Sequence, residues 1–167
     1  WQTMKGSLEP QTEWAPGSRI HVTGNLTIPN GGTLTVGAGT IVKLDSQVDI
    51  TNNGRVLILG TRAEPVLFVP ALPGKPWGGF VMRSGTGEVE GTGVIFTGSG
   101  ADPAWFSKSG NPGSHRKEQA LFFVNDNQRV HLTDAAAISL AGQLGHAVKG
   151  GLFELDHFLM QRATTGG

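Results

Sequence analysis

The chain repeats itself at a constant interval between Gly17 and Ile58. When this stretch is shifted by 22 positions, apolar residues fall on apolar residues and turn residues fall on turn residues. The matched pairs include Gly17/Gly39, Ile20/Val42, Val22/Leu44, Leu26/Val48, Ile28/Ile50, Asn30/Asn52, Leu34/Val56 and Val36/Ile58. A constant period of this length is typical of stacked units, each of which buries its apolar face against the next. The repeat therefore predicts a solenoid.

Each repeat contains three short runs in which apolar residues alternate with other residues, as in Ile20/Val22, Leu26/Ile28 and Leu34/Val36. Alternation with a period of two indicates strands with one buried face, and the Gly, Asn and Pro residues between the runs favour tight turns. Three such strands complete one coil, and stacked coils lie about 4.8 Å apart. We predict an all-β fold: a right-handed parallel β-helix solenoid with three short strands per coil and about six coils of ~22 residues.

The period is interrupted once. A second self-match, at a shift of 42, places Phe80 on Phe122, and the period of 22 returns in Val130/Leu152. The extra residues of the longer shift fit 101–119, where no strand periodicity is seen. Loops inserted into a repeat lie on one face of the array and often carry function. We therefore predict one long loop excursion over 101–119.

The two ends of the repeat suggest how it is covered. Residues 1–15 lack strand periodicity but carry Trp1, Met4, Leu8 and Trp14. An open β-helix exposes an apolar cross-section and a free strand edge, so we expect 1–15 to be an N-terminal cap and 16–167 to be the β-helix. The repeat is still running at Gly167. We therefore expect further coils beyond 167 in the natural protein, or another protein chain, to cover that end.

Composition narrows the function classes. The chain has 167 residues, a net charge of zero and no cysteine. One domain is expected at this length, and neutrality gives no electrostatic attraction to nucleic acid. Without cysteine there is neither a disulfide framework nor a thiolate metal site, which is compatible with an exported bacterial protein. No apolar run reaches membrane-spanning length and no cofactor motif is recognised, so neither membrane insertion nor a cofactor is expected.

The Gly24–Gly60 stretch reads Leu-Thr-Ile, Leu-Thr-Val and Gly-Thr-Ile-Val-Lys-Leu, and Trp77-Gly78-Gly79-Phe80 follows. In these motifs the chain resembles the pectate-lyase-like superfamily of right-handed parallel β-helix repeat proteins. The resemblance implies the fold. It leaves function open, because that superfamily includes polysaccharide lyases and hydrolases, adhesins, phage tailspikes and structural stalks. Its enzymes often use aligned Asp, Lys or Arg on one sheet face, and no such motif is matched here position by position.

The predicted excursion is the first candidate ligand site. An aromatic ring beside amide and cationic donors suits a sugar, since the ring stacks on the apolar sugar face and the polar groups bind hydroxyls or a carboxylate. The alternative is a solvated loop whose aromatic residues pack back onto the sheet. The candidate ligand-binding residues are Trp105, His115 and Arg116 in the excursion, with Gln143, His146 and Arg162 expected on the neighbouring turns.

Asp134 and Asp156 are the second candidate, because they are separated by one repeat period and should therefore lie on adjacent coils. Two close carboxylates could bind Ca²⁺ or act as an acid/base pair. The alternative is structural: Asp before a strand commonly forms an Asx-turn with its own backbone. The sequence leaves both interpretations open.

Two functions remain. The first is a structural or interaction module, without catalytic activity of its own, in a secreted, periplasmic or cell-surface bacterial protein or a larger assembly. The second is a carbohydrate-binding or polysaccharide-cleaving module, lyase-like or hydrolase-like, with its site beside the 101–119 loop. The expected partner is a protein chain or further coils at the C-terminal end in the first case and a polysaccharide in the second.

Overall fold

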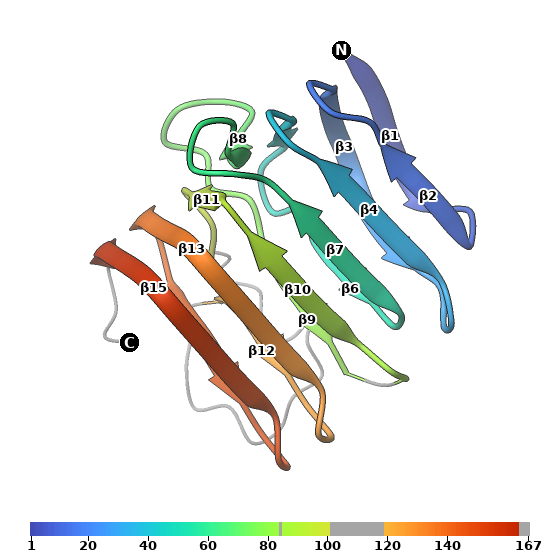
Figure 1. Ribbon diagram of the computed structural model, residues 1–167, viewed down its shortest axis with the longest axis vertical. Helices are drawn as coiled ribbons and strands as arrows, with labels where there is room; N and C mark the ends of the chain where they lie inside the picture. Colours follow the sequence, from blue (N-terminus) through green and yellow to red (C-terminus); the bar gives the residue numbers. More distant parts are fainter. Residues whose placement is uncertain (84, 101–118, 164–167) are drawn as a thin grey trace.

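The computed structural model describes residues 1–83, 85–100 and 119–163. The described residues are all-β, and their strands form one sheet of 15 strands in which every named strand pair is parallel (Figure 1). This is consistent with a parallel β-solenoid. Apart from Gln119, the predicted excursion at 101–119 lies outside the described residues.

The strands are short except where one runs through a bend. In chain order they are β1 (Gln2–Ser7), β2 (Gln11–Trp14), β3 (Arg19–Ile28), β4 (Thr33–Gly37), β5 (Ile41–Leu44), β6 (Ile50–Asn52), β7 (Arg55–Leu59), β8 (Val66–Pro70), β9 (Phe80–Met82), β10 (Glu88–Thr92), β11 (Val94–Thr97), β12 (Ala120–Val124), β13 (Arg129–Leu140), β14 (Gln143–Ala147) and β15 (Leu152–Ala163).

The strand pairs form three parallel ladders, which the chain visits in turn. The first ladder joins β2, β4, β7, β10 and the first halves of β13 and β15, which lie side by side in Figure 1. The second joins the first halves of β1 and β3 to β5, β8, β11 and the second halves of β13 and β15. The third joins the ends of β1 and β3 to β6, β9, β12 and β14.

The predicted period of 22 is confirmed in the first two ladders, where Ile20 pairs with Val42 and Leu34 with Val56. In the third ladder the predicted match of Leu26 with Val48 is wrong, because Leu26 pairs with Ile50. The chain between β5 and β6 carries two additional residues compared with the bend inside β3, and these residues shift the alignment. Turn length therefore changes the spacing without disturbing the pairing of the strands.

Between β13 and β15 the spacing differs from the predicted period by one residue. Phe80 pairs with Phe122 as predicted from the shift of 42. The predicted match of Val130 with Leu152 is wrong, since Val130 pairs with Phe153. A shift of one residue exchanges the inner and outer faces of a strand, so this correction decides which side chains of β15 face inward.

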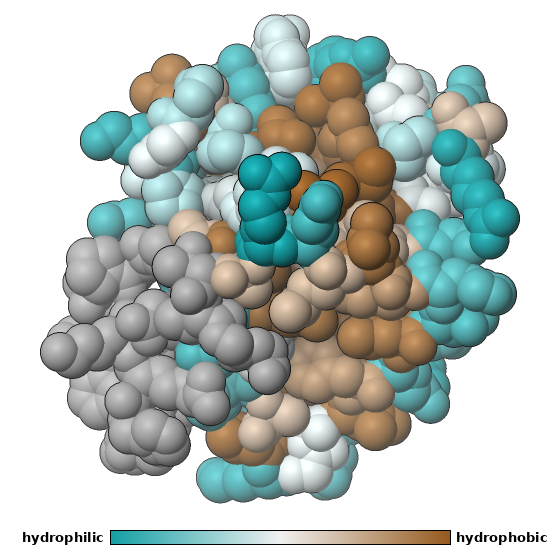
Figure 2. All heavy atoms as spheres, turned by 90° about the vertical axis from the view of Figure 1, so that its left-hand side faces the viewer, coloured by the Kyte–Doolittle hydropathy of each residue, from teal (hydrophilic) through white to brown (hydrophobic). Residues whose placement is uncertain are grey.

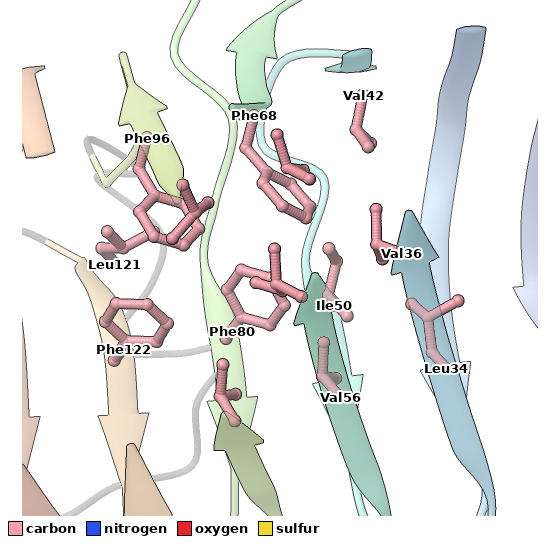
Figure 3. Packing of buried hydrophobic residues seen from close by; sticks show 14 of the residues in the cluster. Leu34, Val36, Val42, Ile50, Val56, Phe68, Phe80, Phe96, Leu121 and Phe122 are labelled. Carbon is pink, nitrogen blue, oxygen red and sulfur yellow. The ribbon is translucent and has the colours of Figure 1, made fainter. Parts of the chain in front are cut away.

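The core is a continuous stack of apolar side chains between the ladders. Its centre is aromatic: Phe68, Phe80, Phe96 and Phe122 gather there (Figure 3), and all four are fully buried together with Trp77. Neighbouring rings stack or meet edge to face, with centroids 5.3–5.5 Å apart for Phe68/Phe96, Phe80/Phe122 and Phe68/Phe80. Since each ring comes from a different strand, the stack ties successive strands of the second and third ladders together.

The segment 1–15 contains two strands that its sequence pattern did not indicate. β1 pairs with β3 and β2 pairs with β4, so both extend the ladders. Leu8 and Trp14 are buried in the core. The predicted division into a cap at 1–15 and a β-helix from residue 16 stays a prediction.

Single residues with positive φ make the bends between ladders. Gly93, Asp134 and His157 occupy one such corner, with φ of 57°, 51° and 47°. The left-handed conformation is uncommon for a residue with a side chain, so Asp134 and His157 are held in it by their surroundings. This is why β13 and β15 run through two ladders without an intervening loop.

Candidate functional site

The sequence-predicted ligand residues are only partly described by the structure. Trp105, His115 and Arg116 lie outside the described residues. Gln143 begins β14 and is buried, and the ring of His146 in β14 stacks on Phe123 with centroids 5.7 Å apart. Arg162 is exposed near the end of β15, where its φ is 57°. The proposed sugar site built from these residues stays a prediction.

Asp134 and Asp156 do not pair with each other, because Thr133 is the partner of Asp156. Asp134 Oδ1 accepts a hydrogen bond from Arg62 Nη2 at 2.5 Å, and this bond lowers the pKa of Asp134 while it raises the pKa of Arg62. His157 Nδ1 lies 3.8 Å from Asp134 Oδ1 and 3.4 Å from Asp156 Oδ2. The corner thus brings Arg62, Asp134, His157 and Asp156 close together.

The sequence leaves Ca²⁺ binding and an acid/base pair open for these two carboxylates. In the part of the chain that the structure describes, no three or more His, Cys, Asp or Glu side chains are grouped so that they could hold a metal ion. The Arg62 guanidinium contacts Asp134 Oδ1. The two carboxylates thus belong to the charged corner, and a role for them in Ca²⁺ binding or as an acid/base pair stays a prediction.

The outer face of the first ladder carries a second charged array. Arg55 Nε lies 3.3 Å from Glu88 Oε2, and Arg55 also donates to Glu90. Arg129 donates to Glu88 from two nitrogens, and its Nη1 lies 3.3 Å from Glu154 Oε2. The hydrogen bonds that Arg129 donates to Glu88 raise the pKa of Arg129. Charges of opposite sign therefore alternate from β7 through β10 and β13 to β15, as cross-strand pairs favour.

A polar cleft of about 270 Å³ lies on the outer side of the third ladder. It is lined by Asn25, Asp49, Thr51, Val81 and Arg83. Four of the five are polar or charged and differ in hydrogen-bonding character: an amide, a carboxylate, a hydroxyl and a guanidinium. This mixture can bind a ligand with hydroxyl and anionic groups.

Asp49 is held rigidly in that cleft. Its carboxylate accepts hydrogen bonds from the Gly79 N–H at 3.2 Å and from the Gln119 side-chain amide. Its own N–H donates to Asn25 Oδ1 at 2.9 Å, and the residue is only 8% exposed. A carboxylate fixed in this way is pre-organised for binding.

The sequence analysis missed this cleft, although one signal for it was present. Gly78 and Gly79 follow Trp77, and a Cβ added at Gly78 would lie 2.0 Å from Asp49 Oδ1. Gly78 is thus required where the chain passes the Asp49 carboxylate, and Gly79 where it passes the backbone oxygens of Ala120 and Leu121. Glycine pairs inside a strand pattern indicate such close approaches, but not which residue is approached.

β15, the last strand of the described residues, exposes side chains at positions that β13 buries. Leu155 and Met160 are 39% and 41% exposed, whereas their partners Leu132 and Ala137 in β13 are fully buried. Figure 2 looks onto this side of the molecule and shows hydrophobic residues gathered across it. Among the described residues, β15 pairs only with β13, and β14 only with β12. In this part of the chain, an apolar surface thus lies beside a strand edge with no further described strand on it.

Comparison with protein-family models, with curated proteins and with solved structures finds no match to the chain. The described residues contain no helix long and apolar enough to cross a membrane. Two described features bear on function: the exposed apolar side chains of β15 and the polar cleft.

Proposed function

We propose that the chain is a structural and interaction module: a right-handed parallel β-helix of about six coils, of the pectate-lyase-like kind, without catalytic activity of its own. It would belong to a secreted, periplasmic or cell-surface bacterial protein or to a larger assembly. The observation that supports this most directly is the apolar end at β15. A sheet edge of this kind is a docking surface, because unpaired backbone groups and apolar side chains together favour strand addition.

The difference in side-chain burial between β13 and β15 supports this proposal. Leu132 and Ala137 of β13 are fully buried, whereas Leu155 and Met160 at the same ladder positions of β15 are 39% and 41% exposed. Full burial of a wholly exposed apolar side chain gains about 1.5–3 kcal/mol, and these partly buried side chains would gain a fraction of that. A partner chain or further coils that add the next layer would obtain this gain at several positions at once.

A photo-crosslinking experiment in the source cells tests the proposal. A crosslinking amino acid replaces Leu155 at the end, and in a matched control it replaces Leu59, which is 51% exposed on the outer face of the first ladder. The expected result is a discrete protein adduct from position 155 and none from position 59. Absence of any adduct at 155, or identical adducts from both positions, would contradict the proposal.

A second candidate function is carbohydrate binding, and the polar cleft favours it. The Arg83 guanidinium suits a uronate carboxylate, the Asp49 carboxylate suits sugar hydroxyls, and Val81 offers an apolar contact to the ring. Wild type, Arg83→Ala and Trp105→Ala would be compared on a glycan array, with Arg19→Ala as the control on the second ladder. Binding that Arg83→Ala abolishes and Arg19→Ala retains would support this function. A wild type that binds no acidic or neutral glycan would rule it out.

A further inference from the structure

A groove of about 320 Å³ lies on the outer surface of the second ladder, where the chain turns toward the third. Its walls come from the end of β8, the end of β11, the end of β13 and the turn that follows β8. β8 pairs with β5 and β11, and β11 pairs with β8 and β13. The groove is therefore formed by consecutive strands inside the array and does not depend on what lies next to β15.

Hydrogen bonds hold the backbone around the groove. The Trp77 indole Nε1–H donates to the Thr97 carbonyl oxygen at 2.8 Å, and the Trp77 N–H donates to the Gly98 carbonyl oxygen at 3.1 Å. A Cβ on Gly98 would lie 2.9 Å from Pro70 Cγ, so the absence of a side chain there permits the close packing of the two walls. The groove is thus preformed, which lowers the entropic cost of binding a ligand.

Most of the groove is apolar. Of the eight described residues that line it, five carry no polar side chain, and Pro70, Pro76 and Ala141 supply the apolar surface. Sites for small molecules typically combine an apolar lining with a few polar groups that fix the orientation of the ligand. This groove therefore suits the apolar body of a small organic molecule.

The polar groups of the groove are the Lys75 ammonium and the hydroxyls of Thr97 and Ser139. Lys75 is exposed beside a tight turn, which its N–H closes by donating to the Leu72 carbonyl oxygen at 3.2 Å. None of the three side chains forms a hydrogen bond or an ion pair with another described residue. An ammonium and hydroxyl donors together suit the oxygen atoms of a carboxylate. Among the described lining residues Lys75 is the one cation, so a single negative charge is matched better than a phosphate dianion.

We propose that this groove binds a small organic carboxylate, with the carboxylate beside Lys75 and a compact apolar body between Pro70, Pro76 and Ala141. The site goes beyond the interaction and carbohydrate-binding functions proposed above and depends on neither. The apolar body supplies most of the affinity, and Lys75 selects an anionic ligand over a neutral one of the same shape. For a ligand of this size the expected Kd is about 0.1–10 mM.

Nuclear magnetic resonance titration of the ¹⁵N-labelled full chain tests the proposal. The probes are cyclohexanecarboxylate, its neutral isostere cyclohexanecarboxamide, and acetate, and the signals followed are the amides of Gly74, Gly98 and Ser139 in the groove. The titrations are repeated on Lys75→Met and on the control Lys149→Met, which replaces an exposed lysine in the turn after β14.

Cyclohexanecarboxylate is expected to shift the groove signals saturably and to bind wild type about three- to tenfold more tightly than the carboxamide. Lys75→Met should remove this preference by weakening the carboxylate alone, whereas Lys149→Met should retain it. Acetate lacks the apolar body and should bind at least about tenfold more weakly than cyclohexanecarboxylate.

Three results would overturn the proposal. Groove signals that do not shift saturably, or saturable shifts confined to Val81 and Arg83 in the polar cleft, would show that the groove is not the binding site. Equal affinities for the carboxylate and the carboxamide would exclude recognition of the anion. A preference for the carboxylate that survives Lys75→Met would remove Lys75 from the site.

Discussion

Removing the ring of Phe80 should destabilise the protein more than any other single truncation in the aromatic stack. The ring is fully buried, and its centroid lies 5.4–6.1 Å from the rings of Phe68, Trp77, Phe96 and Phe122. Phe68, Phe96 and Phe122 come from three different strands of the second and third ladders, and Trp77 lies between β8 and β9. Truncation at this position therefore removes contacts to several strands at once.

The expected magnitude for Phe80→Ala is about 4 kcal/mol in the free energy of unfolding. Buried Phe→Ala substitutions cost about 3–5 kcal/mol, and the cost is highest where the surroundings cannot collapse into the cavity. Here the ladder hydrogen bonds hold neighbouring strands about 4.8 Å apart, so collapse is limited. For a chain of this length the loss corresponds to a decrease of about 8–16 °C in Tm.

Urea unfolding followed by circular dichroism measures the change, and Phe153→Ala is the matched control. Phe153 belongs to the same stack, 6.4 Å from Phe122, but it lies half-buried on β15. Its truncation should cost about 1–2 kcal/mol, because less apolar area is withdrawn from water. Equal losses in the two variants, or a loss below about 2 kcal/mol for Phe80→Ala, would refute the assignment of the interior stack as the main stabilising element.

Three further substitutions test the charged arrays and the inner packing. Glu88→Gln removes a carboxylate that contacts Arg129, so it should lower Tm in low salt and have a smaller effect in about 1 M salt, where exposed charges are screened. Asp134→Asn should destabilise the protein near neutral pH, because Arg62 lowers the pKa of Asp134 in the folded state. The difference in unfolding free energy from wild type should be complete above about pH 5. It should disappear as the pH falls below the unfolded-state pKa of about 3.9 and through the lower folded-state pKa. Gly91→Val should destabilise by about 1–3 kcal/mol in urea unfolding, because a Cβ there would already lie 3.0–3.3 Å from side chains of the two neighbouring strands; unchanged stability would show that these strands move apart easily.

The period of 22 identified β3, β4, β5 and β7 because their inward side chains recur at that interval. Beyond these strands the interval changes, since Val42 pairs with Phe68 and Val56 with Val89. The period failed for Leu26 because the number of residues in a corner can change while the ladder pairing is conserved. A repeat analysis without gaps cannot separate these two effects. The strands at the N-terminus were missed for another reason: Gly6 and the charged Lys5 interrupt the apolar alternation of β1, and β1 has an irregular alignment with β3 at that point.

The candidate sites were harder to predict than the fold. Asp134 and Asp156 are one repeat period apart, but Asp156 pairs with Thr133, and both carboxylates lie near His157. Asp49 and Arg83 are distant in the sequence and meet only because strands of the third ladder stack. Their proximity depends on the lengths of the turns between strands, which a single sequence does not determine.

The position of β15 at the end of the ladders also has a consequence for local stability. In a stacked array each unit is stabilised mainly by its neighbours, and among the described strands β15 has a neighbour on one side only. Its amide hydrogens should therefore exchange by fraying, at a lower opening free energy than those of β7 or β10. A ligand that binds only the folded end would suppress that fraying by an amount set by its concentration relative to Kd. Binding of a ligand at β15 would thus be measurable as slower hydrogen exchange of the β15 amides.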